Sequence, residues 1–218
     1  MPALDVATFA SRMAAGAIPL DLRAPAHFAV SHIRGAVFLQ FGRQDMGDRA
    51  ELYLPRTQPY VLLVEPVALG FVAEKLLTTA GFEVQGFLQG GLQAWTNAGR
   101  PIANVPTMSV HDLHQRLDAG EALDLLDVRE DFEYDWGHVG GAINLPHGDV
   151  WPRAAEFDST RAWYVLCNDQ IRSCAAASML ARLGFAHVTL VLGGTAGWIE
   201  AGYPLVKAGQ AEPLQFPI

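Results

Sequence analysis

The sequence repeats itself at a spacing close to the size of one small domain. Residues 81–102 (GFEVQGFLQGGLQAWTNAGRPI) align without a gap with residues 184–205 (GFAHVTLVLGGTAGWIEAGYPL), at an offset of 103. Upstream, residues 20–37 (LDLRAPAHFAVSHIRGAV) align with residues 126–143 (LDVREDFEYDWGHVGGAI), at an offset of 106. This period is too long for a solenoid repeat. We therefore expect two similar domains, residues 1–103 and 104–218, joined near RPIANVPTMS.

Composition restricts the class of protein. Half of the 218 residues are hydrophobic and the net charge is −8, so the chain can bury sizeable cores and offers no basic surface for nucleic acid or an anionic membrane. The acidic residues look spread along the chain and suggest solubility. The N-terminus shows no secretory signal, and no apolar segment approaches the ~20 residues of a membrane span. Two cysteines make a poor disulfide framework. We expect a cytoplasmic protein with reduced thiols.

Each copy alternates strand and helix signals. In the second copy, Ser109 can cap a helix over VHDLHQRLDA that Gly120 ends, and a second helix is expected from about Ser173 to Leu183. The apolar runs ALDLLDVR, WYVLC and VTLVLGG predict strands, as do IPLDLR, YVLLV and EVQGFLQGG in the first copy. Continuous apolar strands between helices indicate a mostly parallel sheet flanked by helices. The predicted fold class is α/β.

Cys167 lies where a buried parallel strand ends and a helix begins. Ligands bind at this carboxyl edge of open α/β sheets. The N–H groups of a tight loop converge there, and the helix N-terminus adds partial positive charge, so a thiolate would be stabilised and nucleophilic. A buried, purely structural cysteine is the alternative. With Cys167 as nucleophile, the candidate anion-binding residues are Asn168, Asp169, Gln170, Ile171, Arg172 and Ser173.

Four segments resemble a rhodanese-like domain. They are DVRExFEYxxGHVGGAINLP (127–146), CxxxxRS (167–173), LGF (183–185) and LGGTAGWIEAGYP (192–204). The resemblance covers essentially all of the second half and, more weakly, the first. It implies two rhodanese-like domains and a sulfurtransferase without metal or organic cofactor. By this analogy Cys167 takes sulfane sulfur from a small-molecule or protein donor, such as thiosulfate or a persulfide, and passes it to cyanide or a thiol.

The first copy lacks the residues for this chemistry. At the offset of 103, Val64 stands opposite Cys167, and Leu69 and Gly70 stand opposite Arg172 and Ser173. We predict that the first domain is inactive. We also hypothesise that its surface forms one wall of the cleft that holds Cys167.

Two other functions remain open from the sequence. A non-catalytic module could use the same loop to sense a ligand or dock a partner. Related phosphatases and arsenate reductases carry one residue more between the cysteine and the arginine, which makes a wider ring of N–H groups for a tetrahedral anion. Asp169 opposes both thiosulfate and the thiolate, and pairing with Arg172 would offset this charge. We expect slow turnover of thiosulfate, so a persulfide, polysulfide or protein-bound donor stays open.

Several other residues are assigned structural roles. We expect Asp127, Arg129, Glu133 and His138 to form a network at the sheet edge, because Asp21, Arg23 and His32 recur in the copy without a cysteine. A packing role is expected for Cys174, Trp95 and Trp198. His111 and His114 are weak evidence for a metal site. The glycine pairs at 90–91 and 193–194 are interpreted as chain reversals.

Overall fold

The structure is a computed structural model that describes residues 2–42, 44–207 and 213–214. The chain divides into two compact units, Met1–Asn104 and Val105–Ile218. Among the described residues, no helix has both the length and the apolar character that crossing a membrane requires.

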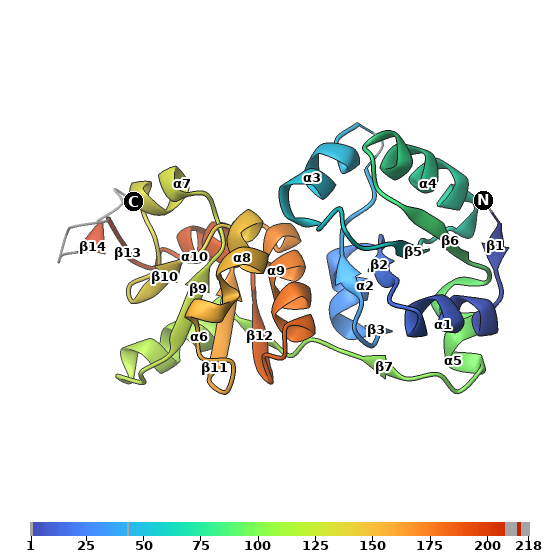
Figure 1. Ribbon diagram of the computed structural model, residues 1–218. Helices are drawn as coiled ribbons and strands as arrows, with labels where there is room; N and C mark the ends of the chain where they lie inside the picture. Colours follow the sequence, from blue (N-terminus) through green and yellow to red (C-terminus); the bar gives the residue numbers. More distant parts are fainter. Residues whose placement is uncertain (1, 43, 208–212, 215–218) are drawn as a thin grey trace. The chain divides into compact units, whose positions relative to one another are not determined.

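The first unit contains a five-stranded parallel sheet with the strand order β1-β6-β5-β2-β4 (Figure 1). Its strands are β1 (Ala3–Leu4), β2 (Ile18–Asp21), β4 (Val37–Phe38), β5 (Tyr60–Leu63) and β6 (Val84–Leu88). A separate antiparallel pair joins β3 (His32–Ile33) to β7 (Ile102–Ala103). The helices are α1 (Val6–Ala14), α2 (Pro25–Val30), α3 (Met46–Tyr53), the 3₁₀ turn η1 (Val67–Leu69), α4 (Gly70–Thr79) and α5 (Gly91–Asn97).

The second unit contains a five-stranded parallel sheet with the strand order β10-β9-β11-β12-β8. Its strands are β8 (Thr107–Ser109), β9 (Asp124–Asp127), β10 (Ala142–Asn144), β11 (Ala162–Leu166) and β12 (His187–Leu192). Strands β13 (Leu205–Val206) and β14 (Pro213–Leu214) form an antiparallel pair. The helices are α6 (Val110–Asp118), α7 (Asp131–Trp136), α8 (Val150–Arg153), α9 (Ile171–Arg182) and α10 (Gly194–Glu200), with 3₁₀ turns η2 (His147–Asp149) and η3 (Ala154–Glu156).

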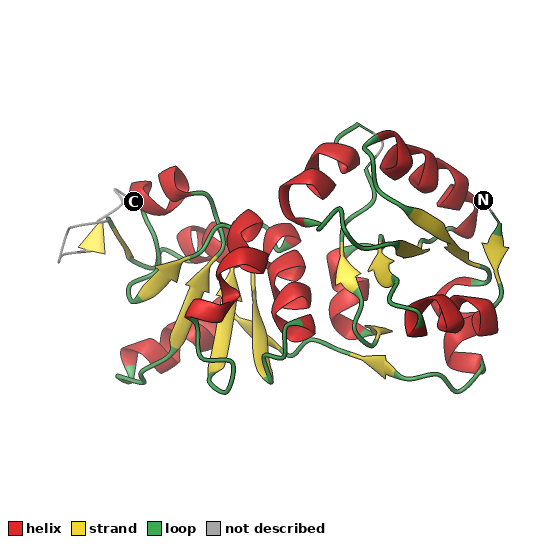
Figure 2. Cartoon of the chain, viewed as in Figure 1, coloured by secondary structure: helices red, strands yellow, loops and turns green. Residues whose placement is uncertain are grey.

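The two sheets have the same topology. When the strands of each sheet are ranked along the chain, the first sheet read from β1 and the second sheet read from β8 both have the order first, fifth, fourth, second, third. Helices flank each sheet, as Figure 2 shows for each unit. The prediction of two α/β units with parallel sheets is therefore confirmed, and the shared order explains the sequence repeat.

The expected N-cap of α6 and the expected packing of the two tryptophans are also present. Ser109 caps α6 by accepting a hydrogen bond of 3.0 Å from the backbone N–H of Asp112. Trp95 and Trp198 are buried on α5 and α10, and each indole N–H donates to the carbonyl of a following proline, Pro101 or Pro204. The two tryptophans therefore anchor equivalent helices and the chain segments that follow them, as a packing role requires.

Candidate active site

Strand β11 delivers Cys167 to the carboxyl edge of the second sheet. The strand lies between β9 and β12, and Cys167 follows its last residue, Leu166. Continuous apolar residues form β11 because a central parallel strand is covered on both faces. The Cys167 side chain is completely buried, with a relative exposure of 0%. The sulfur therefore lies at the bottom of the loop, beneath the exposed residues Asn168 and Asp169.

Two backbone amides of the loop are directed at this sulfur. The N–H groups of Gln170 and Ser173 donate to Cys167 Sγ over 3.1 and 3.3 Å. The hydroxyl oxygen of Ser173 lies 3.4 Å from Sγ, so it can donate to a thiolate by turning its proton away from the Gln170 carbonyl. N–H groups at this position favour the anionic form of a group at the focus of the loop. Of the six predicted cradle residues, Gln170 and Ser173 reach the sulfur by these contacts.

Gln170 gives the loop its shape. Its φ angle is +79°, and it is the one non-glycine residue with positive φ in the described part of the chain. This left-handed residue turns the chain directly into α9, which begins at Ile171, two residues earlier than predicted. Positive φ at a residue other than glycine costs free energy and persists where the surroundings enforce it. Here the strained turn brings the Gln170 amide to the sulfur.

Asp169 and Arg172 do not form the pair that the sequence suggested. One carboxylate oxygen of Asp169 accepts a hydrogen bond from the Ile171 amide over 3.3 Å and lies 3.9 Å from Cys167 Sγ. Arg172 instead extends to α7, where both of its terminal nitrogens contact the two carboxylate oxygens of Glu133. The suggested pairing takes no hydrogen-bonded form, because a bidentate carboxylate is available to Arg172 on a neighbouring helix, while the charge of Asp169 still contributes to the raised pKa of Arg172.

The Arg172–Glu133 pair also changes the role assigned to Glu133. Both side chains are 23% exposed. The hydrogen bonds from Arg172 lower the pKa of Glu133, and the same contact raises the pKa of Arg172, so both groups are charged at neutral pH. Glu133 was expected in the sheet-edge network. It belongs to the Cys167 loop instead, since it orients the arginine of that loop.

The Arg172–Glu133 pair is absent from the first copy of the repeat. At the offset of 106 Glu133 corresponds to His27, and at 103 Arg172 corresponds to Leu69, so both partners are absent from the first copy. Asp127 and Arg129 are both kept in the first copy. Many other positions also differ between the copies, so this difference agrees with the contact but does not by itself predict it.

The aspartate–arginine pair that both copies of the repeat contain has a structural role. Asp127 is fully buried, and Arg129 binds it through Nε and through Nη2 at 2.7 Å, with a further bond to the Gly137 carbonyl. Asp21 and Arg23 form the same bidentate contact in the first unit. A buried ion pair with its remaining donors satisfied fixes local geometry. The predicted structural role is confirmed for these two pairs.

His138 lies apart from that ion pair. Its ring stacks on Tyr134 with centroids 3.7 Å apart, and its Nδ1 lies 3.0 Å from the Tyr134 carbonyl oxygen. Its backbone pairs with Val206. These contacts hold the chain between α7 and β10 against β13, which is also a structural role.

The second glycine pair does more than reverse the chain. Gly193 and Gly194 both have positive φ, and a Cβ on Gly194 would overlap the carbonyl oxygens of Cys167 and Asn168. The amide of Thr195, at the start of α10, donates to the Cys167 carbonyl over 2.8 Å. Glycine is therefore needed for α10 to approach the loop this closely. The sequence interpretation missed this contact.

His147 is a further residue that the sequence interpretation missed. It is buried at the start of η2, and its Nδ1 lies 3.5 Å from a carboxylate oxygen of Glu130. Burial, reinforced by the positive charge of Arg172, lowers the pKa of His147 to about 4. His147 is therefore neutral at physiological pH, in the surroundings of the Arg172–Glu133 pair.

Cys174 has the packing role that was predicted. It is buried in the first turn of α9, and the two cysteines are not joined in a disulfide. Burial raises the pKa of Cys174 to about 12, with an added effect of the nearby Cys167. A thiol in this state is a poor nucleophile at neutral pH.

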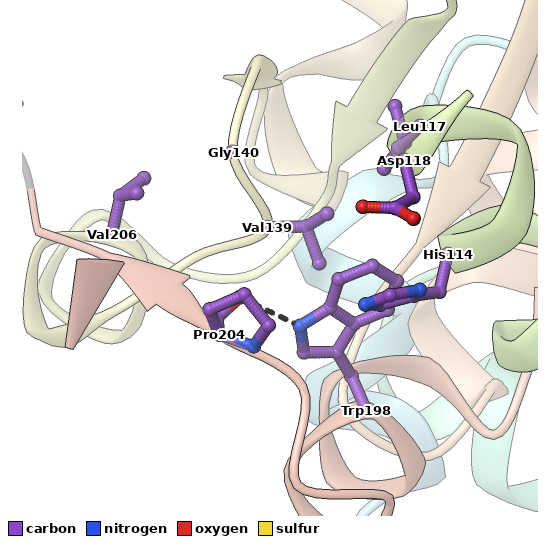
Figure 3. A pocket seen from close by; sticks show the side chains of 8 residues that line it. All are labelled: His114, Leu117, Asp118, Val139, Gly140, Trp198, Pro204 and Val206. Carbon is purple, nitrogen blue, oxygen red and sulfur yellow. Dashed lines mark hydrogen bonds between the residues drawn. The ribbon is translucent and has the colours of Figure 1, made fainter. Parts of the chain in front are cut away.

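A pocket of about 300 Å³ in the second unit lies outside the Cys167 loop. Figure 3 shows the His114 ring beside the Trp198 indole, with Asp118 at the same opening. The remaining lining residues are Leu117, Val139, Gly140, Pro204 and Val206.

His111 binds the Tyr203 hydroxyl through Nδ1, and His114 stacks on the Tyr203 ring at 3.8 Å. Over the described ranges, no three His, Cys, Asp or Glu side chains are grouped to hold a metal.

The equivalent loop of the first unit has a different structure. Val64 is completely buried at the position of Cys167, and η1 precedes α4 where the second unit has its left-handed turn. Glu65 is the first residue of this loop, and its carboxylate accepts a hydrogen bond of 3.0 Å from the amide of Leu92 in α5. The first unit therefore places an acidic side chain at this sheet edge and presents no sulfur.

Comparison with known proteins identifies the family. The chain is 34% identical over 110 residues to the "Putative sulfur carrier protein YrkF" of Bacillus subtilis, a match that covers 50% of this chain and 57% of that protein's length. It is 32% identical over 94 residues to the thiosulfate sulfurtransferase GlpE of Shewanella oneidensis, covering 43% of this chain and 92% of that protein. A crystal structure of a rhodanese-related protein from Thermoplasma volcanium is 33% identical, covers 46% of this chain and 97% of the other, and has a TM-score of 0.42. The sequence profile of the Rhodanese-like domain matches residues 5–98 and again residues 109–201. The chain therefore belongs to the rhodanese family and carries two rhodanese-like domains.

Proposed function

We propose that the second domain is a sulfurtransferase in which Cys167 carries sulfane sulfur as a persulfide. The observation that supports this most is the pair of amides, Gln170 and Ser173, that donate to Cys167 Sγ. One relative of this chain, GlpE of Shewanella oneidensis, is named a thiosulfate sulfurtransferase. N–H groups preorganised around a sulfur stabilise negative charge on it without the reorganisation that water would need.

The reaction has two displacement steps. In the first, the Cys167 thiolate attacks the outer sulfur of a donor such as thiosulfate, the sulfur–sulfur bond of the donor breaks, and sulfite leaves with the bonding electron pair. In the second, cyanide or a thiolate attacks the outer sulfur of the Cys167 persulfide, and Cys167 departs as a thiolate. The products are thiocyanate or a new persulfide. Charge and electrons balance in each step, and neither step needs a metal or organic cofactor.

Arg172 supplies positive charge to the loop, and Glu133 orients it. The bidentate contact fixes the guanidinium plane, which is the geometry that arginine provides and lysine does not. Glu133 also neutralises much of the charge of Arg172, and exposed Asp169 adds a negative charge at the loop. A dianionic donor is therefore weakly attracted. This supports slow use of thiosulfate and leaves persulfide, polysulfide and protein-bound donors open.

The first domain is inactive in this proposal. Val64 cannot carry sulfur, and the Glu65 carboxylate already accepts the Leu92 amide at the equivalent sheet edge. An anionic donor would meet a carboxylate at this position.

The test is sulfur transfer to cyanide, followed as thiocyanate with thiosulfate, polysulfide and a small persulfide as alternative donors. We expect turnover with at least one donor, loss of turnover in Cys167→Ser, and retention in Cys174→Ser. The Cys174 variant is the matched control, since it removes the other cysteine of the protein, which lies in the first turn of α9. Equal turnover in Cys167→Ser and wild type would refute the proposal.

A further inference from the structure

The six-residue helix α7 presents two pairs of side chains to solvent. Phe132 and Trp136 are 72% and 55% exposed, and Asp131 and Asp135 are exposed as well. Residues four apart lie on the same side of a helix, so the aromatic pair and the acidic pair form adjacent stripes. We call these four residues the α7 face.

The α7 face is fixed beside the Cys167 loop. Glu133, in the same helix, makes the bidentate contact to Arg172 of the loop. Its other partner is the amide of Glu130, with which it forms a capping box at the start of α7. Glu133 therefore ties the first turn of α7 to the loop, and a molecule bound to the α7 face would lie near the Cys167 loop.

The net negative charge of the protein comes from the domain that carries this face. Residues 105–218 contain 15 acidic and seven basic residues, a formal charge of −8, whereas residues 1–104 contain eight of each. Acidic residues are spread along the whole chain, and their excess over basic residues lies in the second domain. Asp169 adds an exposed carboxylate on the loop itself. A field of one sign steers partners of the opposite sign and repels those of the same sign.

The composition of the face is that of a protein contact. Single exposed apolar residues are common on any surface and need no explanation. Aromatic residues are enriched in interfaces, however, and an adjacent aromatic pair bordered by charges resembles an anchor with a polar rim.

The burial of Cys167 means that a protein acceptor needs a surface to position its thiol. The Cys167 side chain has a relative exposure of 0%, so a donor or an acceptor must come close to the loop to react with the sulfur there, and the acceptor attacks the outer sulfur of the persulfide. Cyanide or a small thiol can diffuse to it. A thiol on a protein must be brought to the loop and oriented, and this needs a binding surface near the loop.

We propose that the α7 face docks a basic protein that carries the acceptor cysteine. This inference rests on the proposed sulfurtransferase function and names the class of its partner. The partner's thiolate attacks the outer sulfur of the Cys167 persulfide, the sulfur–sulfur bond breaks, and Cys167 regains a thiolate while the partner keeps the persulfide. Aromatic contacts with Phe132 and Trp136 hold the partner, and Asp131 and Asp135 select its charge.

The test uses the full chain, loaded with sulfur and checked by intact mass, and three synthetic cysteine peptides. The peptides share length, cysteine and leucines, and differ only in carrying lysines, serines or glutamates. We expect kcat/KM for the lysine peptide to exceed that for the serine peptide about tenfold at low salt, since electrostatic steering has this size. The glutamate peptide should be the poorest acceptor, and added salt should reduce the differences.

Variants of the face separate docking from chemistry. Asp131→Lys with Asp135→Lys should reverse the preference toward the glutamate peptide, and Phe132→Ser with Trp136→Ser should weaken transfer to all three peptides. Transfer to β-mercaptoethanol should be unchanged in both. The matched control is Asp118→Lys with Glu200→Lys, which changes the charge of the domain equally at exposed sites outside α7 and should keep the lysine preference.

Each result decides the proposal. Equal transfer to the three peptides, or an equal loss of preference in the control variant, would overturn the α7 face while leaving the sulfurtransferase function intact. A wild-type protein that never gains sulfur from any donor would overturn both. A lysine preference that the charge variant reverses, together with weaker transfer to all three peptides in the aromatic variant and unchanged transfer to the small thiol in both, would establish the face as the docking surface.

Discussion

Arg172 and Glu133 lie 39 residues apart and meet in a bidentate ion pair between α9 and α7, with one bond of 2.9 Å. The pair connects the loop that holds Cys167 to α7, whose Glu133 was expected in the sheet-edge network instead. It also has no counterpart in the first unit, where Leu69 and His27 occupy the two positions. The ion pair therefore distinguishes the two domains as clearly as the cysteine does.

Arg172 is expected to matter for catalysis through its charge. Arg172→Met should lower kcat/KM for thiosulfate about 10–100-fold, the effect of losing a charged hydrogen bond of about 1.5–3 kcal/mol. Glu133→Gln should lower KM for thiosulfate, because the arginine charge is no longer neutralised. Steady-state kinetics would measure both, with Arg182→Met at the other end of α9 as control. A Glu133→Gln variant with raised KM would contradict this role.

The buried Asp127–Arg129 pair is expected to serve stability. Asp127→Asn should lower the free energy of unfolding by about 3 kcal/mol, because it leaves the Arg129 charge buried and unpaired. Asp21→Asn should do the same in the first unit and leave sulfur loading of Cys167 intact. Denaturant unfolding and intact mass would measure the two effects. Unchanged stability in both variants would show that the pairs do not anchor the sheet edge.

The left-handed turn at Gln170 is expected to lower the stability of the protein and to hold the loop in the shape that loads sulfur. Gln170→Gly keeps the amide and removes the cost of positive φ, so the free energy of unfolding should rise by about 1 kcal/mol. The looser loop should load sulfur more slowly. Gln170→Val should destabilise the protein, since a β-branched residue tolerates this conformation poorly. Thermal melts and loading rates would report both properties, and a Gly variant that loads faster would argue against a shaped cradle.

His147 is expected to make the protein sensitive to acid. Its pKa is about 4 in the folded protein and 6.5 in an unfolded chain, so the unfolded chain binds the proton more tightly. The contribution of His147 to the free energy of unfolding should therefore be fully present above pH 6.5 and be lost as the pH is lowered from 6.5 toward 4. His147→Gln should show a smaller loss of Tm between pH 7 and pH 5 than wild type. Identical losses would mean that His147 does not titrate in this window.

The sequence was sufficient for the parts of the structure that depend on periodicity and repetition. Continuous apolar runs identified the strands that flank the loop, because buried parallel strands need apolar residues on both faces. The position of Cys167 after such a run located the candidate site. The recurrence of Asp21 and Arg23 identified the structural ion pair, since a feature kept without the cysteine is independent of its chemistry.

The contacts that the sequence did not predict are those across the fold. Glu133 reaches Arg172 only because α7 packs near the start of α9, and His147 reaches the same region from η2. The left-handed conformation of Gln170 was also missed, because glutamine carries no signal for positive φ. These features depend on how elements pack together, which propensity and spacing along the chain do not encode.

The most direct test of the account is to locate the sulfur atom that the protein accepts. Wild type, Cys167→Ser and Cys174→Ser would be treated with polysulfide or thiosulfate, alkylated and mapped by peptide mass. The account predicts one added sulfur on the peptide containing Cys167 in wild type and Cys174→Ser, and none in Cys167→Ser. Sulfur found on Cys174, or found equally in all three proteins, would contradict it.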